Sequence, residues 1–187
     1  MKVRSLELPE VLLIEPKIFE DRRGCFLETW SKERYEEAGL GERFVQDNAS
    51  LSMQGTLRGL HLQHPHGQGK LVFVLEGEVF DVAVDVRRGS PRFGRWLGWQ
   101  LSCTNMHQLY IPPGFAHGFC VTSSKAVFVY KCTESYRPEA ELGIRYDDTD
   151  IGISWPVDQP IVSEKDAKNA RLAELDPTLL PPFVPEL

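Results

Sequence analysis

The sequence predicts an all-β protein folded as a small barrel or sandwich. About eight to ten short segments have the pattern of strands, and turn signals separate them at nearly regular spacing. In residues 71–86, apolar side chains recur at every second position, which is the period of an extended chain. Helical patterns are confined to two short stretches, at 31–40 and in a tail from about 163. A chain of 187 residues can bury a good core, and no linker divides it, so we expect a single domain over 1–187.

The N-terminal part of the chain supplies two expected strands and one expected helix. Residues 9–30 have the pattern of two short strands around an EDRRG turn, and Pro16 suits an edge strand or a strand start. Ser31 then stands where a helix N-cap is expected, immediately before KERYEEAGL. We expect this helix to end at Gly39 or Gly41.

The middle of the chain supplies most of the predicted strands. In order, they are FVQDNASLSM at 44–53, LRGLHLQ at 57–63, 71–86 with an EGE turn inside it, WLGWQLS at 96–102, HQLYI at 107–111 and KAVFVYKC at 125–132. After the EGE turn, one strand face carries Phe80, Val82, Val84 and Val86, and the other carries Val79, Asp81, Ala83 and Asp85. On the last strand, one face carries Ala126, Phe128, Tyr130 and Cys132.

A second helix is expected in the C-terminal tail. Ser163 can cap EKDAKNARLAEL, which we expect to continue as far as Asp176 and Pro177, where proline ends it. The last residues, LLPPFVPEL, contain too much proline for regular structure.

Composition and charge argue against several classes of protein. No apolar run reaches membrane-spanning length, and charges interrupt the first 15 residues, where a signal peptide needs an apolar block, so we expect a cytoplasmic protein without a membrane partner. Four scattered cysteines without a CxxC pair predict reduced, buried side chains. A net charge of −6 argues against nucleic-acid binding, which needs a basic face. An anionic small ligand remains open if cations gather locally, and the candidates are Arg22, Arg23, Arg58 and Lys70.

Polar residues are concentrated between 55 and 85, a stretch that contains three of the five histidines. Near His61 the sequence places further polar side chains at spacings seen on paired strands of one barrel: Arg58, Gln63, Lys70 and His117. A lone histidine in a strand is usually structural, but His61 is not alone. Arg58 and His61 are an odd number of residues apart, so a regular strand would point them to opposite faces. If both line one pocket, the strand must be irregular, and Gly59 is the natural place for a bulge.

A metal centre is one hypothesis for these residues. His61 and Gln63, followed by Pro112, Gly114 and His117 in a P-x-G-x-x-H pattern, resemble the two motifs of metal-binding cupins. Those motifs use His-x-His with a carboxylate and then another histidine, whereas Gln63 is a poor ligand and no glutamate follows at the expected place. Because two histidines alone hold a metal weakly, the sequence favours a barrel without one.

Proton transfer without a metal is the second hypothesis. His61, with an unperturbed pKa of about 6.5, suits a general base at neutral pH. Asp166 is a candidate orienting partner, although its spacing also suits completion of the helix cap with Ser163. Tyr130 is either a core tyrosine or a neutral acid that faces His61 across a pocket. Lys70 is either a solvated charge at a strand edge or a group that stabilises an enolate oxygen.

Several longer motifs follow one another along the chain. They are LRGLHLQ, QGKLVFVLEGEVFDVAVDVRRGSP, FG-x-W, QLYIPPGFAHGF, YKCTESY and IGISWP. In this order and spacing they closely resemble the dTDP-4-dehydrorhamnose 3,5-epimerases, and the resemblance covers essentially the whole chain, from EPKIFEDRRG through SEKD. It implies a cofactor-free, metal-free, cupin-like jelly-roll barrel. It also implies a dTDP-linked 4-keto-6-deoxyhexose as substrate, dTDP-4-dehydro-6-deoxy-D-glucose, which is inverted at C3 and C5 to dTDP-4-dehydro-L-rhamnose.

The resemblance further implies roles for individual residues. His61 matches the family's base, and Asp166 matches the dyad partner of that base. Tyr130 matches the acid on the opposite face of the sugar, and Lys70 matches the lysine near the C4 carbonyl. The positions that contact the nucleotide sugar match Arg23, Glu28, Gln46, Asn48, Arg58, His117, Tyr136, Glu141 and Lys165.

Two properties of the family bear on assembly and on the reaction. The N-terminal segment of family members crosses to a second subunit, so we expect about the first 30 residues to contact the partner in a homodimer. Relatives that invert only C3 or only C5 keep the same dyad and tyrosine. An epimerase acting at one centre therefore stays open. Two rivals from other classes also remain: a metal-dependent cupin enzyme and, ranked last, a non-catalytic barrel that binds a sugar nucleotide.

Overall fold

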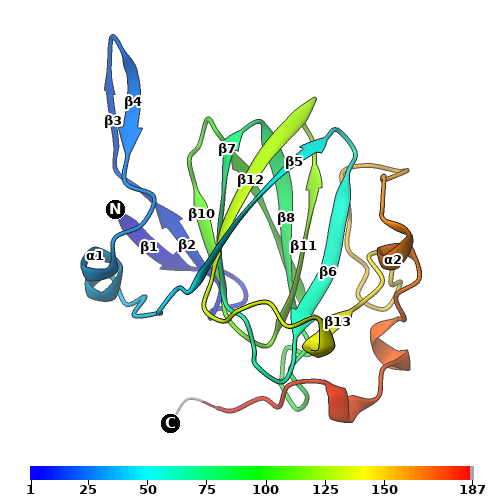
Figure 1. Cartoon of the computed structure of the whole chain (residues 1–187). Coiled ribbons are helices and arrows are strands. Elements are labelled where there is room, and N and C mark those ends of the chain that lie inside the picture. The colour runs from blue at the N-terminus through cyan, green and yellow to red at the C-terminus, as the bar shows by residue number, and fades with distance from the viewer. Residues whose placement is uncertain (186–187) are drawn as a thin grey trace.

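The computed structural model describes residues 1–185, which form two β-sheets that face each other (Figure 1). The six-stranded sheet has the order β1-β2-β10-β7-β12-β5, and the five-stranded sheet has the order β13-β6-β11-β8-β9. The first sheet contains β1 (Lys2–Ser5), β2 (Leu12–Glu15), β5 (Gln46–Met53), β7 (Lys70–Glu76), β10 (Gln108–Ile111) and β12 (Lys125–Cys132). The second contains β6 (Leu57–Gln63), β8 (Glu78–Asp85), β9 (Trp96–Ser102), β11 (Phe115–Val121) and β13 (Glu141–Gly143). The prediction of an all-β fold is confirmed.

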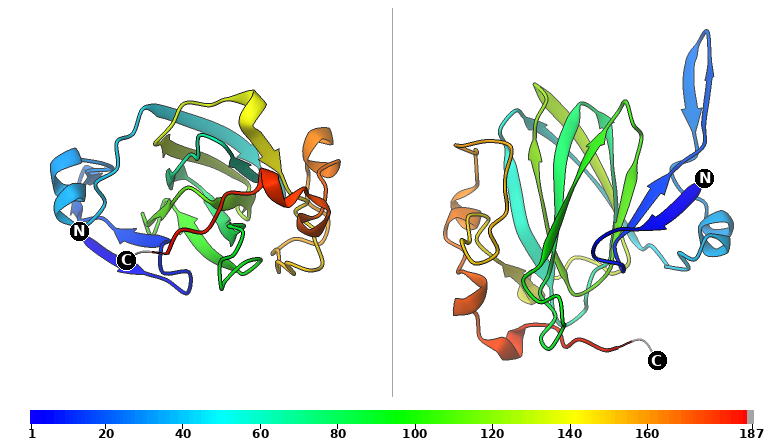
Figure 2. Two further views of the ribbon diagram at one scale, coloured as in Figure 1. Left: turned by 90° about the horizontal axis from the view of Figure 1, so that it is seen from below. Right: turned by 180° about the vertical axis from the view of Figure 1, so that it is seen from behind.

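The alternation seen in the sequence places two apolar layers on the two sides of β8. Val79 and Ala83 lie in the core between the sheets, together with residues of β7, β10, β11 and β12. Val82 and Val84 point to the other side of β8, where the chain after β13 covers them. Figure 2 shows this C-terminal segment along the outer face of the five-stranded sheet. Both faces of β8 are therefore buried, including the face that carries Asp81.

The first helix packs against the outer face of the six-stranded sheet. It is α1 (Lys32–Glu37), and its Tyr35 is buried with Ile14, Leu71 and Tyr110. Ser31 is the N-cap residue, as predicted, although its side chain makes no capping hydrogen bond. Gly39 has φ of +89°, the left-handed conformation that glycine adopts easily, so the helix ends where the sequence predicted.

The predicted C-terminal helix is wrong in its length, because α2 (Glu164–Ala167) ends after one turn. Ala170 instead forms a bridge with Ile144, and the backbone N–H of Leu172 donates to the buried carboxylate of Asp148. These tertiary contacts use backbone groups that a longer helix would need internally. The remaining helical turns are of the 3-10 type, η1 (Pro138–Ala140), η2 (Leu172–Glu174) and η3 (Pro177–Leu179).

The proline-rich end of the chain follows the barrel without regular structure, as predicted, apart from Leu179, which ends η3, and a bridge between Pro182 and Arg88. Glu186 and Leu187 of this segment lie outside the described residues. Residues 1–185 contain no helix long and apolar enough to cross a membrane. Of the four free cysteines, Cys120 and Cys132 are buried as expected, whereas Cys25 is exposed on a hairpin, contrary to expectation.

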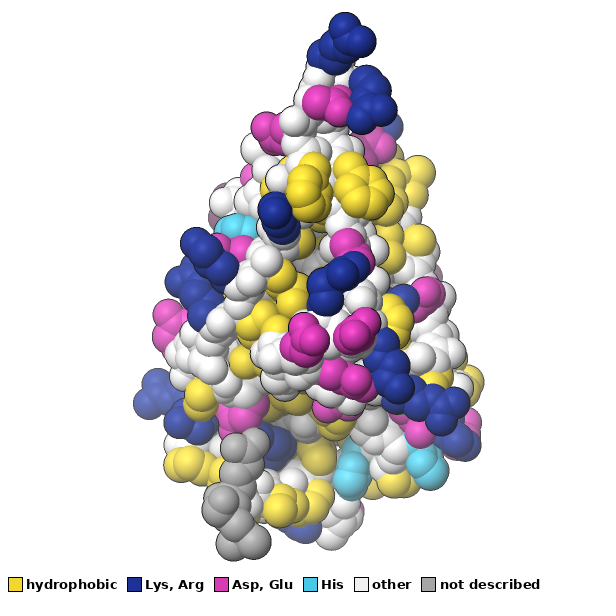
Figure 3. Space-filling view, turned by 90° about the vertical axis from the view of Figure 1, so that its left-hand side faces the viewer, with side chains coloured by type: hydrophobic (Ala, Val, Ile, Leu, Met, Phe, Trp, Pro, Cys, Tyr) yellow, Lys and Arg dark blue, Asp and Glu magenta, His cyan; other side chains and the backbone are white. Residues whose placement is uncertain are grey.

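That hairpin projects away from the barrel (Figure 1). It consists of β3 (Ile18–Asp21) and β4 (Gly24–Leu27), so the predicted turn at EDRRG is confirmed. Neither strand joins a barrel sheet, and both Phe19 and Phe26 are exposed, with 52% and 70% of their surface accessible. In Figure 3, basic side chains occupy the tip of the molecule and hydrophobic ones gather just below it. This segment has too few contacts of its own to bury its aromatic rings.

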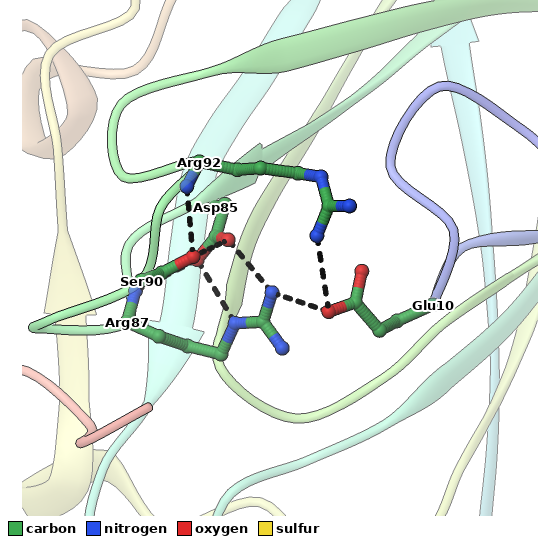
Figure 4. A network of polar contacts seen from close by, with 5 residues as sticks. All are labelled: Glu10, Asp85, Arg87, Ser90 and Arg92. Carbon is green, nitrogen blue, oxygen red and sulfur yellow. Dashed lines mark hydrogen bonds and ion pairs between the residues drawn. The ribbon is translucent and has the colours of Figure 1, made fainter. Parts of the chain in front are cut away.

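A network of charged groups connects one end of the barrel to the N-terminal segment (Figure 4). Arg87 donates to both oxygens of the buried Asp85 and to Glu10, while the Ser90 hydroxyl donates to Asp85. The Arg87 guanidinium also lies over the rings of Phe115 and Phe183, at 4.4 and 5.0 Å from their centroids. Hydrogen bonds hold the pKa of the Asp85 carboxyl below its usual range although burial acts in the opposite direction.

Candidate active site

A cavity of about 530 Å³ lies between the two sheets. Strands β6, β7, β11, β12 and β13 supply its polar walls, and the chain around α2 covers one side. Phe119 and Phe128 form part of its apolar lining, with stacked rings 4.0 Å apart at their centroids. Ten of the residues predicted from sequence line it: Arg58, His61, Gln63, Lys70, His117, Tyr130, Tyr136, Glu141, Lys165 and Asp166. Its volume is typical of sites for small organic ligands.

His61 and Asp166 form a histidine–carboxylate pair at the wall of the cavity. The Nε2 atom of His61 lies 2.7 Å from Oδ1 of Asp166, although the two residues are 105 positions apart in sequence. The backbone N–H of Asp166 donates to the Ser163 hydroxyl, so this residue takes part in the helix cap and also orients the histidine. Burial raises the pKa of Asp166, but hydrogen bonds with His61, Gly59 and Ser163 hold it below its usual range. The carboxylate is therefore ionised, and Nδ1 of His61 is the ring nitrogen left for a ligand.

An irregularity in β6 brings Arg58 and His61 to the same cavity, as the odd spacing required. His61 pairs with His117 on β11, but Arg58 pairs with Phe119, so the register shifts between them. Gly59 lies at the shift with φ of +123°. A Cβ atom on Gly59 would lie 2.6 Å from the Cα atom of Gly118, which leaves room for glycine alone. The predicted bulge is confirmed.

Tyr130 and Lys70 line the cavity together with His61, from the opposite sheet. Burial raises the pKa of the Tyr130 phenol, so this group stays protonated at neutral pH and can donate a proton. Burial lowers the pKa of the Lys70 ammonium, whereas Cys132, Asp81 and Glu141 act in the opposite direction.

A second histidine–carboxylate pair lies beside the first. Nε2 of His117 is 2.8 Å from Oδ2 of Asp81, and Asp81 is completely buried. Sequence reasoning identified His117 but missed Asp81. The available signal was a carboxylate on the inward face of β8, where Val79 and Ala83 flank it in the core.

Three other predicted residues form a polar group at the cavity wall. The Tyr136 hydroxyl donates to Glu141 at 2.8 Å, and the Lys165 ammonium pairs with the same carboxylate. Burial raises the pKa of Glu141, but these two hydrogen bonds and the nearby His61 hold it below its usual range. Tyr136 and Lys165 are largely exposed, so this group is accessible to a ligand that enters from solvent.

The remaining four predicted residues lie outside the cavity. Gln46 and Asn48 are neighbours on β5, where Gln46 accepts a hydrogen bond from the backbone of Tyr136 and Asn48 pairs in register with Tyr130. Arg23 lies on the projecting hairpin and pairs with Asp21. Glu28 follows the hairpin and pairs with Arg34. Within one chain, Arg23 and Glu28 are therefore not brought to His61.

Within residues 1–185, no group of three or more His, Cys, Asp or Glu side chains is arranged to hold a metal ion. The two histidines in the cavity each use Nε2 to contact a carboxylate. Gln63 is also occupied, because its amide nitrogen donates to the carbonyl of His66 and its oxygen accepts from the backbone of Arg137.

Comparison with known proteins identifies close relatives over nearly the full chain. Residues 5–174 match the family described as dTDP-4-dehydrorhamnose 3,5-epimerase. A protein of that name from Shigella flexneri is 51% identical over 178 residues, which are 94% of this chain and 98% of the relative. A dTDP-4-dehydrorhamnose 3-epimerase from Streptomyces niveus is 38% identical over 186 residues, which are 98% of this chain and 90% of that protein.

A solved structure extends the likeness to three dimensions. It is dTDP-6-deoxy-D-glucose-3,5-epimerase from Legionella pneumophila Philadelphia 1, in complex with dTDP-4-keto-L-rhamnose. The two chains are 51% identical and superpose with a TM-score of 0.95, over 98% of this chain and 99% of the other. The expected cupin-like fold is confirmed by this agreement. By its sequence and its fold, the chain belongs to the dTDP-4-dehydrorhamnose 3,5-epimerase family.

Proposed function

We propose that the protein inverts C3 and C5 of dTDP-4-dehydro-6-deoxy-D-glucose to give dTDP-4-dehydro-L-rhamnose. The observation that carries this proposal is that His61, oriented by Asp166, and the neutral Tyr130 line one cavity. The cations Arg58, Lys70 and Lys165 also line it and suit a ligand with a diphosphate. The ligand named for the Legionella protein, dTDP-4-keto-L-rhamnose, supports the same substrate class.

The chemistry follows from the ketone at C4 of the sugar. A ketone acidifies the hydrogens on both neighbouring carbons, so one base beside it can serve C3 and C5. His61 accepts the proton, and the electron pair of the C–H bond moves to the carbonyl oxygen to form an enolate. The Lys70 ammonium stabilises the negative oxygen. Tyr130 then donates its proton to carbon from the opposite face, which inverts the centre, and proton exchange with water restores the imidazole and the phenol.

Solvent deuterium tests this proposal directly. The wild-type protein and dTDP-4-dehydro-6-deoxy-D-glucose are combined in D₂O, and the sugar is analysed by NMR. We expect deuterium at C3 and at C5, together with both inverted configurations. Absence of exchange at both carbons, in a protein that still binds dTDP, would contradict the proposal.

A one-centre epimerase is the second candidate, and the Streptomyces niveus relative is the observation that favours it. That protein is named as a 3-epimerase, although it aligns over 98% of this chain. The same experiment separates the two functions, because a 3-epimerase places deuterium at C3 alone.

We also propose that the protein is a homodimer in which the β3–β4 hairpin of each chain reaches the cavity of its partner. The hairpin exposes Phe19 and Phe26 and carries Arg23, while the cavity is open to solvent. The edge strand β5 also exposes Leu51 and Met53, with 63% and 61% of their surface accessible. Two copies that paired through these surfaces would bury aromatic and aliphatic side chains and would complete the substrate contacts with Arg23 and Glu28.

A further inference from the structure

Asp81 carries a buried carboxylate to which the reaction proposed above assigns no role. None of its surface is accessible, and the flanking Val79 and Ala83 belong to the apolar core. One oxygen, Oδ2, lies 2.8 Å from Nε2 of His117. The other, Oδ1, is buried and has no hydrogen-bond partner among residues 1–185. Burial of a carboxylate is costly unless a positive charge compensates it, so the surroundings of Asp81 should contain a cation.

Lys70 is the cation whose charge acts on Asp81. It begins β7, in the sheet that faces β8, and it lines the cavity. Burial raises the pKa of Asp81, whereas His117 and Lys70 lower it. Conversely, burial lowers the pKa of Lys70, and the groups that oppose this effect are Cys132 on β12, Asp81 on β8 and Glu141 on β13.

Of these three groups, Asp81 is the one with a charge and an unused acceptor oxygen to compensate the charge of Lys70. Burial raises the pKa of the Cys132 thiol, so this side chain is uncharged at neutral pH. Glu141 already pairs with Lys165 and accepts a hydrogen bond from Tyr136. Asp81, in contrast, has an oxygen that no hydrogen bond uses within residues 1–185.

We propose that Asp81 is a positioning residue: it is the buried counter-charge of Lys70 and the hydrogen-bond partner of His117. It keeps Lys70 as an ammonium ion beside the carbonyl oxygen of the substrate, and it orients the His117 ring through Nε2. This inference rests on the proposed function, because Lys70 needs its charge only if an enolate forms in the cavity. Its consequence is that the alkaline limit of activity depends on a residue that never touches the sugar.

The activity test uses Asp81→Asn, which keeps the size of the side chain and an oxygen for the His117 contact but removes the charge. Without that charge the pKa of Lys70 falls further, so the ammonium ion is lost at lower pH. We expect the alkaline limb of the kcat profile to move down by at least about one pH unit, since one unit corresponds to ~1.4 kcal/mol of lost charge interaction. Cys132→Ser is the matched control, and its alkaline limb should stay in place. If Asp81→Asn lowered kcat by the same factor at every pH and the alkaline limb stayed at the wild-type pH, Asp81 would have only a structural role.

A double-mutant cycle in stability tests the charge pairing without substrate. Lys70→Met, Asp81→Asn and the double variant are compared with the wild type by urea unfolding. Each single change leaves one buried charge uncompensated, so the double variant should be more stable than the sum of the single effects predicts. It should fold even if Asp81→Asn alone does not. If the effects of the two single changes on the free energy of unfolding were strictly additive, the pairing of Lys70 with Asp81 would be refuted. If the two changes were coupled but the wild-type protein exchanged no substrate hydrogen for deuterium, only the proposed function would be refuted.

Discussion

The orientation of His61 is fixed by one contact, with Asp166, which is far away in the sequence. Because Asp166 occupies Nε2 at 2.7 Å, Nδ1 is the ring nitrogen left for a ligand in the cavity that His61 lines. Asp166 in turn is held at the start of the short helix α2, where its backbone N–H donates to the Ser163 hydroxyl. A carboxylate fixed in this way sets both the tautomer and the angle of the imidazole, which are the properties that a general base needs.

His61→Asn is expected to reduce kcat by about 10²–10⁴-fold, because it removes the general base. Deuterium exchange at C3 and C5 should fall by the same factor, while the protein still folds and still binds dTDP. His66→Asn is the matched control, since His66 is exposed and its φ of +67° suits asparagine. Activity of the His61 variant within tenfold of the wild type would assign the base to another residue.

Tyr130→Phe separates proton removal from proton return. The base is intact in this variant, so exchange of the substrate hydrogen with solvent should continue, while formation of the inverted product slows by about 10²-fold or more. Both rates are followed in one NMR experiment in D₂O. Tyr146→Phe, outside the cavity lining, should change neither rate. Equal loss of exchange and inversion in the Tyr130 variant would count against its role as the acid.

Asp166 also links stability to pH. Its pKa is lower in the folded protein than the value of about 3.9 expected in the unfolded chain. A lowered pKa contributes stability above the unfolded value, and this contribution disappears as the pH falls through the folded value. Asp166→Asn should therefore destabilise the protein by about 1.5–3 kcal/mol at pH 7 and by clearly less near pH 3 in urea unfolding. The exposed Asp158→Asn is the control, and it should leave the free energy of unfolding close to that of the wild type.

At the scale of elements, the irregular strand β6 decides which side chains enter the cavity. Its register shift at Gly59 turns Arg58 and His61 toward the same space, although their spacing would separate them in a regular strand. The close approach of Gly59 to β11 makes this shift possible. The bulge is therefore part of the site and not a defect of the sheet.

Gly59→Ala is expected to destabilise the protein by about 2–6 kcal/mol, from backbone strain together with steric overlap against β11. The control is Gly24→Ala in the β3–β4 hairpin. Gly24 has a nearly equal φ of +126°, but nothing lies within 4 Å of its Cβ position, so only the strain of about 1–3 kcal/mol should appear. Equal effects of the two changes on urea unfolding would mean that β11 yields to the added methyl group.

At the scale of the whole molecule, the projecting β3–β4 hairpin is the feature that most needs a partner surface. A hairpin with two exposed phenylalanines is marginally stable in water unless other strands or another chain pack against it. It also carries Arg23, which the site of its own chain does not use. Both facts agree with a second copy of the chain as the partner.

Mixed dimers test this arrangement. His61→Asn and Arg23→Ala chains are each expected to have low activity, but a dimer of one with the other contains one site with His61 and the partner's intact hairpin. Co-expressed chains with two different tags should therefore recover about half of the wild-type activity per dimer, because a two-fold dimer has two equivalent sites. No recovery, with both chains present in the purified dimer, would place Arg23 in the site of its own chain.

Local sequence patterns predicted much of the fold, and the prediction that was wrong has a physical explanation. The alternation in 79–86 predicted β8, because a period of two is a property of the extended backbone itself. The prediction of a helix beyond Ala167 was wrong, because the backbone groups of Ala170 and Leu172 contact Ile144 and Asp148 and do not form helical hydrogen bonds. A local sequence pattern does not show whether tertiary contacts will replace helical hydrogen bonds.

The sequence by itself determined the strand alternation and the turn at EDRRG, since each is encoded within a few neighbouring residues. The candidate reactive groups came from a resemblance to a family that covers nearly the whole chain. Only the tertiary structure decided that Asp166 meets His61 across 105 positions, that Asp81 lies buried against His117, and that Arg23 stands apart from both. The reason is that distances between strands depend on how two sheets pack and where a register shifts. Those quantities are set by the whole core at once and not by any single segment.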